Sequence, residues 1–305
     1  MSGGNRLASN KKAYFFALVS VLFWSTAGSA FKLTLFYLHP HQLLFLASFF
    51  SFLALFILYA FTNKFKINEL AQPIHLARSA FLGFLNPFLY YVVLFRAYSL
   101  LPAQEAVALN YLWPVALVLL SIPLLKQKLS WISLLAILIS FSGTIVIAMR
   151  GDFSSFVLSD PLGVSLAVGS SLVWALYWIF NMKDTREALG KLVLNFTFGT
   201  LYITILIVFT SPTLSFEWQG FAGAGYIGLF EMGFTFFFWL LALKYSDTTA
   251  RISNLIFLSP FLSLIFIRII VKETIMLSTV IGLVLIITGV LMQHYFSEKV
   301  AVQKS

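Results

Sequence analysis

The sequence contains no cysteine, and only 10% of its 305 residues are charged. Without cysteine the chain has no disulfide bond, no thiolate metal site and no thiol nucleophile. The shortage of charge excludes a soluble globular protein, in which about 25% of residues are charged and about 45–50% are apolar. Here 60% of the residues are hydrophobic and the mean hydropathy is +0.93, which is typical of a protein with many membrane-spanning helices.

Acidic residues are the scarcer charged type, 11 against 20 Lys and Arg, and the net charge is +9. In a soluble protein such an excess of positive charge would indicate a nucleic-acid partner. In a membrane protein Lys and Arg collect in the cytoplasmic loops, which accounts for the same excess. We therefore expect the lipid bilayer, and no nucleic acid, as the surroundings of this chain.

Apolar runs between charged or turn-forming residues predict an all-α membrane protein with ten spans. The polar link Arg150–Asp160 separates five spans from five, so residues 1–150 form a first five-helix repeat and residues 151–305 a second. Arg6, Lys11 and Lys12 before the first apolar run also resemble a signal peptide, but removing that run would spoil the repeat. The predicted spans are 13–32, 41–62, 79–99, 103–125, 130–149, 161–182, 191–210, 219–243, 248–271 and 275–296.

The positions of Lys and Arg predict the orientation in the membrane. With the N-terminus in the cytoplasm, fifteen of the 20 fall at cytoplasmic ends of the spans. This bias predicts cytoplasmic termini and an even number of spans, in a multi-pass protein of the cell membrane, the inner membrane in a bacterium. The five on the other side are Lys32, Arg96, Arg150, Arg268 and Lys272.

The two halves repeat each other in sequence. A shift of 146 positions lays Pro114 on Pro260, and the same shift lays Lys126 on Lys272 and Gly143 on Gly289. A shift of 150 lays Trp24 on Trp174. Because each half has an odd number of spans, the second half enters the membrane from the opposite side, which is the inverted repeat of many secondary transporters.

The matched prolines, Pro114 and Pro260, lie near the middle of their spans. Proline removes a backbone donor and disturbs the preceding turn, so both are expected to act as kink or hinge residues. Paired interruptions of this kind point to a binding site near the middle of the membrane. The other reading is that proline is simply commoner in membrane helices than in soluble ones.

At this point the chain resembles a known family, the EamA-type branch of the drug/metabolite transporter superfamily. The resemblance covers essentially the whole chain. It implies ten helices, a central cavity between the halves, and export of amino acids, metabolites or drug-like compounds. The residues that carry it are the Trp24 helix, Pro260 followed by Lys272-Glu273, and the glycines Gly282 and Gly289.

The first repeat departs from that pattern in two places. It has Gln127 where the second has Glu273, and Ala136 where the second has Gly282. An acid at the end of the fourth span is thus dispensable. We therefore expect Glu273 to cap or anchor a helix rather than to drive transport.

Charged residues within spans are candidates for a function, because inserting each one at the centre of a membrane helix costs about 2.5–3.5 kcal/mol of free energy. Glu231, at the middle of its span, is a candidate for binding a substrate ammonium group or a coupling proton. It could instead be a buried acid bonded to a neighbouring helix. Arg251 and Glu105 occupy equivalent positions in the two repeats, as gate charges or as interfacial anchors.

Aromatic residues near polar positions predict the walls of a small-molecule cavity. We expect the site between the third, fourth, eighth and ninth helices, with the first and sixth closing it. Most of the 34 Phe, 12 Tyr and 7 Trp face lipid or the membrane interface, so each choice competes with that role. The candidate substrate-binding residues are Trp24, Asn86, Tyr90, Asn110, Trp113, Trp174, Trp178, Glu231, Trp239, Arg251 and Asn254.

Enzyme and pump signatures are missing from the sequence. It has no phosphate-binding loop, its four His have no metal-ligand spacing, and no Ser–His–acid set is readable. We expect no cofactor and no metal. The sequence predicts a secondary transporter that exports small organic metabolites by alternating access, as a monomer or loose dimer, with protons as a candidate coupling ion. A uniporter or metabolite exchanger, and more remotely an intramembrane lipid-modifying enzyme, are the alternatives.

Overall fold

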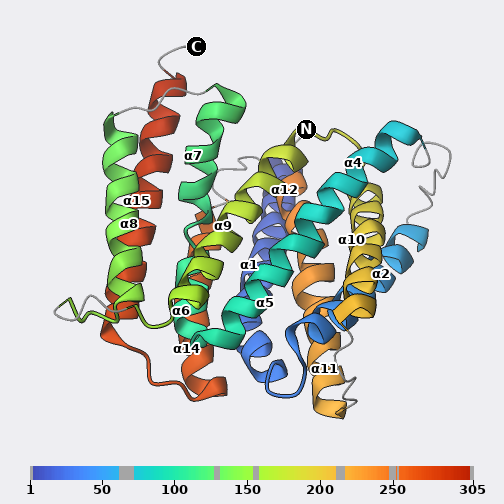
Figure 1. Cartoon of the computed structure of the whole chain (residues 1–305). Coiled ribbons are helices and arrows are strands. Elements are labelled where there is room, and N and C mark those ends of the chain that lie inside the picture. The colour runs from blue at the N-terminus through green and yellow to red at the C-terminus, as the bar shows by residue number, and fades with distance from the viewer. Residues whose placement is uncertain are drawn as a thin grey trace.

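Helices make up all the regular structure of the described residues in this computed structural model (Figure 1). Seven of them are long and apolar enough to cross a membrane, and three shorter apolar helices accompany them. The protein is therefore an all-helical, multi-pass membrane protein, as its composition predicts. The structure describes residues 3–61, 72–126, 131–153, 158–210, 217–246, 252 and 254–302.

The helices of the first half follow the predicted spans closely. The third and fourth spans are each divided into shorter helices. The elements are α1 (Gly3–Thr34), α2 (Pro40–Phe61), α4 (Pro73–Gly83), η1 (Phe84–Leu89), α5 (Tyr90–Leu100), α6 (Ala103–Asn110), α7 (Trp113–Leu125) and α8 (Trp131–Ala148).

The second half has the same plan. Its third and fourth apolar segments are again divided. The elements are α9 (Pro161–Met182), α10 (Ala188–Thr210), α11 (Trp218–Tyr226), η2 (Ile227–Phe234), α12 (Thr235–Tyr245), η3 (Asn254–Leu258), α14 (Ser259–Phe266), η4 (Ile267–Val271) and α15 (Leu277–Val302).

Both chain ends lie at the top of the view in Figure 1, and the connection between the two halves lies at the bottom. We call these the termini side and the linker side. The termini side holds the ends of α7, α9 and α12, and the linker side holds the start of α6 and the ends of α1 and α5 (Figure 1).

Turns of π-helix interrupt the same span in both halves. η1 lies between α4 and α5, and η2 lies between α11 and α12. A π-turn widens the helix locally and displaces the side chains that follow it, and such turns are frequent at functional sites. Glu231 lies within η2, so this irregularity sets the direction of its carboxylate.

The two matched prolines begin helices rather than bending them. Pro114 is in the first turn of α7, after the break that follows α6, and Pro260 is in the first turn of α14, after the 3-10 turn η3. Each span is therefore interrupted at its proline, by a break between two helices rather than by a bend within one, and a hinge role for the two prolines stays a prediction. Proline suits the first turn, where its missing N–H would have no helical partner and its φ is already set.

Helices α8 and α15 form a close pair at one edge of the molecule (Figure 1). Glycines permit the approach: a Cβ on Gly143 would lie 2.4 Å from the backbone oxygen of Gly282, and one on Gly289 would lie 2.4 Å from that of Ala136. Small residues allow membrane helices to pack backbone to backbone. Ser140 adds a hydrogen bond to the carbonyl of Ile286 at 3.2 Å.

The remaining contacts cross between the halves. α1 packs against α12 and α14 of the second half, and α9 packs against α5 and α7 of the first. α2 lies against α10 and η2. Neither half therefore has a core of its own, since each helix near the centre depends on partners from the other half.

Two lysines at equivalent positions end their helices in the left-handed conformation. Lys126 has φ 55° after α7, and Lys272 has φ 62° after η4. This conformation costs an L-residue with a Cβ roughly 1–2 kcal/mol, and glycine avoids that cost.

Replacing Lys272 with glycine is therefore expected to raise the stability of the protein by about 1 kcal/mol. The measurement is thermal unfolding in detergent. Lys244→Gly, in the last turn of α12 with ordinary helical geometry, is the control and should lower the melting temperature. Equal effects of the two changes would contradict the argument from the left-handed cap.

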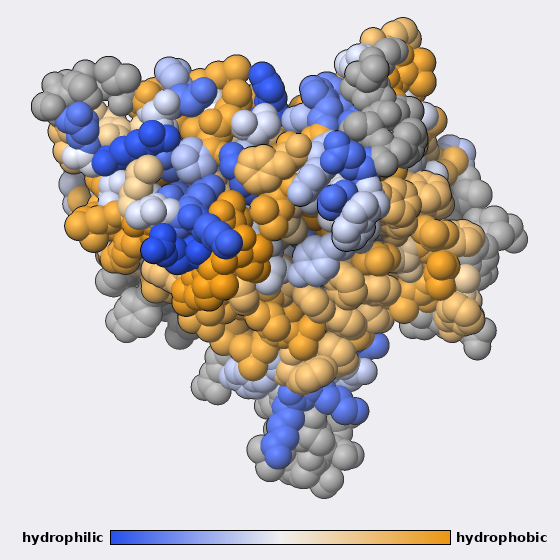
Figure 2. Space-filling view, turned by 90° about the horizontal axis from the view of Figure 1, so that it is seen from below, coloured by the Kyte–Doolittle hydropathy of each residue, from blue (hydrophilic) through white to orange (hydrophobic). Residues whose placement is uncertain are grey.

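Large apolar side chains on the outer surface fit contact with lipid. Phe15, Phe209 and Trp218 are 63%, 84% and 74% exposed. On the face shown in Figure 2, hydrophilic residues gather in patches beside broad hydrophobic areas. Such apolar exposure is explained by a bilayer and not by water.

Candidate functional site

A cavity of about 540 Å³ lies among the helices of both halves. Its lining comes from α1, α5, α6, α7, α9, η2 and α12, with further residues from η3, α8 and α15. The position between the halves agrees with the sequence-based expectation. The first and sixth apolar helices, α1 and α9, form walls of the cavity, whereas the sequence suggested that they only close it.

Most of the predicted substrate-binding residues line this cavity. Asn86 and Pro260 are buried outside the lining, Arg251 lies outside the described residues, and Asn254 is described only as the first residue of η3. Those in the lining are Trp24, Tyr90, Asn110, Trp113, Pro114, Trp174, Trp178, Glu231 and Trp239.

Asn86 belongs to the contact between η1, α9 and α10. It is 1% exposed, and the hydroxyl of Tyr177 lies toward it and toward Asn195. The sequence placed Asn86 in the cavity because it is one helical turn from Tyr90. Within η1 the backbone of Asn86 is extended, with φ −149° and ψ 121°, which breaks the helical register to Tyr90 and directs Asn86 elsewhere.

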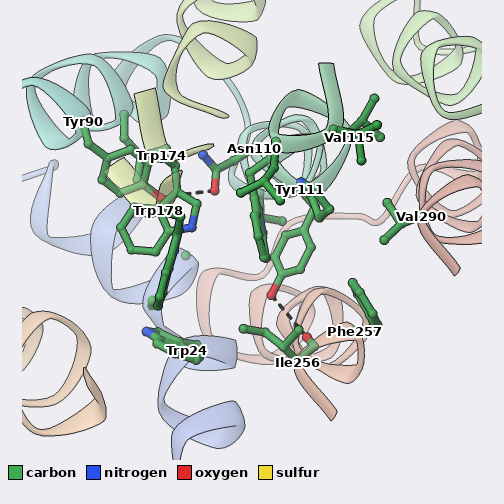
Figure 3. Close-up of a pocket in the computed structure, with 18 of the residues that line it drawn as sticks. Trp24, Tyr90, Asn110, Tyr111, Val115, Trp174, Trp178, Ile256, Phe257 and Val290 are labelled. Carbon is green, nitrogen blue, oxygen red and sulfur yellow. Dashed lines mark hydrogen bonds between the residues drawn. The ribbon is translucent and has the colours of Figure 1, made fainter. Parts of the chain in front are cut away.

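Aromatic rings form a continuous wall. The ring of Trp174 lies 4.6 Å from that of Tyr90 and 5.9 Å from that of Trp178, centroid to centroid. The ring of Trp24 lies 5.4 Å from that of Trp239. Figure 3 shows Tyr90, Trp174 and Trp178 close together, with Trp24 farther along the cavity.

The position of the tryptophans distinguishes the wall from the lipid-facing surface. Five of the seven line the cavity, and the other two, Trp131 and Trp218, are 72% and 74% exposed. Tryptophan provides a large apolar face with a single N–H donor. The cavity therefore suits a ligand with an aromatic or otherwise flat apolar part.

A short chain of hydrogen bonds crosses the wall between the two halves. The hydroxyl of Tyr90 donates to Oδ1 of Asn110 at 3.3 Å, and Nδ2 of Asn110 donates to the hydroxyl of Ser170 at 2.8 Å (Figure 3). These bonds join α5, α6 and α9, and the first of them, between Tyr90 and Asn110, is the one drawn in Figure 3. They fix the direction of the Asn110 amide at the cavity.

Glu231 brings a carboxylate into the cavity lining, where it is 7% exposed. The hydroxyl of Tyr91 lies 2.9 Å from each of its two oxygens. The structure thus combines the two readings of this residue, since Glu231 both faces the cavity and is hydrogen-bonded to a neighbouring helix. A buried carboxylate held by a neutral donor retains free lone pairs for a further partner.

Sequence reasoning missed Tyr91 and the rings that line the linker-side half of the cavity. Tyr91 is separated from Glu231 by 140 residues, and no local pattern relates them. Tyr98 follows Leu94 and Tyr90 on the same helical face, which is a signal that could have identified it. Other lining residues missed are Phe31, Tyr111 and Phe257.

The cavity reaches the termini side. Its lining extends to Met182, the last residue of α9, which is 59% exposed, and to Leu243 near the end of α12. On the linker side Phe31 packs against Phe95 at 4.9 Å and Tyr98 at 5.2 Å, and all three rings are buried. In this structure the cavity therefore opens toward one side of the molecule.

Polar contacts secure the closed side. Glu105, fully buried in the first turn of α6, accepts from Nε of Arg150 at 2.7 Å and from the hydroxyl of Ser159 at 2.7 Å. Glu105 therefore joins α6 to the connection between the halves. This agrees with an anchoring role.

Glu273 caps the start of α6 from the second half. Its two carboxylate oxygens accept from the backbone N–H groups of Ala103 and Gln104, at 2.9 and 3.3 Å. Gln104 returns a hydrogen bond to the carbonyl of Thr274. The prediction that Glu273 caps or anchors a helix agrees with this geometry, and the favourable interaction of an acid with a helix N-terminus explains it.

Within the described residues, His, Asp and Glu side chains do not gather in groups of three or more that could hold a metal ion. The cavity itself offers hydroxyl, amide and indole groups and the carboxylate of Glu231. These groups can bind a small molecule through hydrogen bonds, apolar contact and one charge.

An apolar, all-helical chain built around a cavity that opens to one side has the architecture of a membrane transporter. The chain belongs to the EamA-like transporter family, whose sequence profile matches residues 11–149 and, a second time, residues 161–293. This confirms the resemblance to the EamA-type branch of the drug/metabolite transporter superfamily.

Three relatives from bacteria illustrate the similarity. The uncharacterized transporter YvbV of Bacillus subtilis is 25% identical over 234 residues, 75% of this chain and 73% of the relative. An uncharacterized transporter of Clostridium kluyveri is 27% identical over 303 residues, 95% of each. The aromatic amino acid exporter YddG of Ancylobacter novellus is 26% identical over 164 residues, 52% of this chain and 55% of the relative.

A solved crystal structure aligns with 95% of this chain and 99% of its own chain, with a TM-score of 0.66 and 21% identity. At that level of identity the match shows a shared fold. The names of the family and the relatives indicate a transporter rather than an enzyme.

Proposed function

We propose that this protein is a secondary transporter that exports small organic metabolites by alternating access around the aromatic cavity. The observation that carries the proposal is a cavity of about 540 Å³ that is lined by both halves, reaches the termini side and is closed at the linker side. A site that faces one side at a time is what alternating access requires.

The proposal includes two five-helix repeats, residues 1–150 and 151–305, of opposite orientation. The family profile matches each half separately, and π-turns and left-handed lysine caps occur at equivalent positions in both. The contacts between α8 and α15 are equivalent as well, since the close approach of Gly143 to Gly282 corresponds to that of Gly289 to Ala136. Such a relation supports a second state, in which the halves exchange their conformations.

We place both termini in the cytoplasm and the protein in the bacterial inner membrane, from the distribution of Lys and Arg. With this orientation the cavity faces the cytoplasm, ready to receive a solute for export. The relative named as an aromatic amino acid exporter supports export and an aromatic solute, as do the tryptophans of the wall.

Two other modes of transport fit the same fold. A uniporter moves solute down its own gradient, and an exchanger requires a second solute on the opposite side. Proton coupling through Glu231 would instead require a gradient of pH. An intramembrane lipid-modifying enzyme is disfavoured, because the described cavity lining pairs no second acid or histidine with Glu231.

The test is transport by purified protein in proteoliposomes, with a panel of labelled aromatic metabolites. We expect saturable transport of at least one solute, and a dependence on an imposed pH gradient if protons are coupled. Glu231→Gln should then lose the response to the gradient. If no solute of the panel is moved or bound, the proposal of a metabolite transporter for this cavity is wrong.

Replacing Trp174 with alanine is expected to weaken solute binding about two- to tenfold, because one stacked aromatic contact is worth about 0.5–1.5 kcal/mol. The measurement is the solute concentration at half-maximal transport. Trp131→Ala removes a 72% exposed tryptophan outside the cavity and is the matched control. An equal effect of both changes would contradict the placement of the site.

A further inference from the structure

We propose that the solute is an organic cation, an aromatic amine without a carboxylate, and that Glu231 is its counter-charge. The inference rests on the proposed transport function and names the class of solute. This class of solute differs from the amino acids in the name of one relative, because an amino acid has a carboxylate as well as an ammonium group.

The charges of the cavity carry the argument. Among its described lining residues, Glu231 is the one acid, and Lys, Arg and His are absent. The other hydrogen-bonding side chains in the lining are the indoles of Trp, the phenols of Tyr and the amide of Asn110, all of which are neutral. The described lining therefore offers a negative charge or none, and nothing positive.

A solute with a carboxylate would bury that charge without a cationic partner among the described lining residues. An isolated ion in an apolar site is strongly unfavourable, and proteins bury charges in pairs. An ammonium group meets the carboxylate of Glu231 instead. The same site thus stabilises the cation and disfavours the zwitterion.

The burial of Glu231 and its hydrogen bond from Tyr91 favour the binding of an ammonium group. Glu231 is 7% exposed, so an incoming ammonium group would pair with it away from water, where a charge-assisted hydrogen bond is strong. Tyr91 is fully buried outside the cavity lining, and its hydroxyl donates to the carboxylate of Glu231 from there. Tyr91 is therefore a positioning residue for Glu231.

Aromatic rings continue from this acid into the cavity. The ring of Tyr91 lies 4.7 Å from that of Tyr90, which lies 4.6 Å from that of Trp174. Faces of Tyr and Trp attract cations, and they also stack on an aromatic ligand. An amine attached to a flat ring would use the acid and the wall together, and about 540 Å³ is an ordinary size for a small-molecule site.

The test compares three solutes that share an indole ring with a two-carbon side chain. Tryptamine adds an ammonium group, tryptophan adds an ammonium group and a carboxylate, and 3-ethylindole has neither. Binding is measured with full-length protein in detergent, by the rise in melting temperature when each solute is added and by competition between the solutes. The unfolding signal does not use tryptophan fluorescence, because the solutes also contain indole. We expect tryptamine to bind at least about tenfold more tightly than tryptophan, a difference of about 1.4 kcal/mol. Tryptophan that binds as tightly as tryptamine, or more tightly, overturns the inference.

Glu231→Gln should weaken tryptamine at least about tenfold and leave 3-ethylindole unchanged, because only the charge interaction is removed. Tyr91→Phe should weaken tryptamine less, with 3-ethylindole again unchanged. Glu217→Gln, an exposed acid before α11 on the same span, is the matched control and should alter nothing. Unchanged tryptamine binding in Glu231→Gln overturns the inference.

Failure of this inference is distinguishable from failure of the proposed transport function. If tryptophan is transported as well as tryptamine or better, and Trp174→Ala weakens that transport, the cavity is the transport site and only the class of solute is wrong. If none of the three solutes binds, the class is wrong as well, and the wider panel in proteoliposomes decides the transport function separately.

Discussion

Replacing Gly143 with leucine is expected to separate α8 from α15 and to destabilise the whole protein by several kcal/mol. A Cβ at this position would lie 2.4 Å from the backbone oxygen of Gly282, a contact that no side-chain rotation relieves. Overpacking of this kind costs about 1–3 kcal/mol in a soluble core, and more where backbone must move. The measurement is the melting temperature of the purified protein.

Gly169→Leu is the matched control, because it makes the same substitution within α9 at a position where a Cβ would meet nothing within 4 Å. We expect only the small effect of changing a helical residue. Similar losses of stability in the two variants would contradict the close approach of α8 and α15.

Replacing Arg150 with glutamine is expected to release the closed linker side. The change leaves the fully buried carboxylate of Glu105 with the hydroxyl of Ser159 and without its ion pair. Breaking a buried pair costs about 3–5 kcal/mol when a buried charge remains, and the low end applies here because Arg150 is 43% exposed.

The reverse change gives an internal comparison. Glu105→Gln leaves behind Arg150, whose exposed side chain can be hydrated, so the loss of stability should be smaller than in Arg150→Gln. Thermal unfolding of both variants measures the difference. Equal losses, or a larger loss in Glu105→Gln, would contradict the role of the buried carboxylate.

Much of the helical plan could be predicted from the sequence because lipid makes local composition decisive. Since each span must satisfy its own backbone groups in a bilayer, apolar runs between charged residues locate the helices to within a few residues. The largest departure is at α1, which begins at Gly3, and smaller ones are at α4, which begins at Pro73, and at α15, which continues to Val302. Polar helix ends continue past the apolar run that identifies the span.

The walls of the cavity were predicted in part, and the failures have a physical reason. Trp24 and Trp174 stood out because each is matched across the repeat. The prediction for Asn86 was wrong because its backbone is extended within η1, so spacing along an ideal helix does not relate it to Tyr90. Tyr91 was missed because its partner, Glu231, is distant in the sequence, and only the packing of α5 against the second half brings them together.

The anchoring contacts show the same limit. Glu273 was expected to cap or anchor a helix because the other repeat lacks the acid, and it caps α6, a helix of the other half. Lys32 was predicted at the linker-side end of α1, where it donates to the carbonyls of Tyr98 and Leu101. The sequence predicts on which side of the membrane such residues lie, but their hydrogen-bond partners follow only from the fold.

Access to the cavity from each side of the membrane is the measurement that tests the central claim most directly. The chain has no cysteine, so Val118→Cys, in α7 at the cavity, provides the only thiol. A membrane-impermeant maleimide should label it from the termini side and poorly from the linker side, bound solute should protect it, and Arg150→Gln should admit the reagent from the linker side. Equal labelling from both sides in the otherwise unaltered chain, or labelling that solute does not reduce, would contradict alternating access around this cavity.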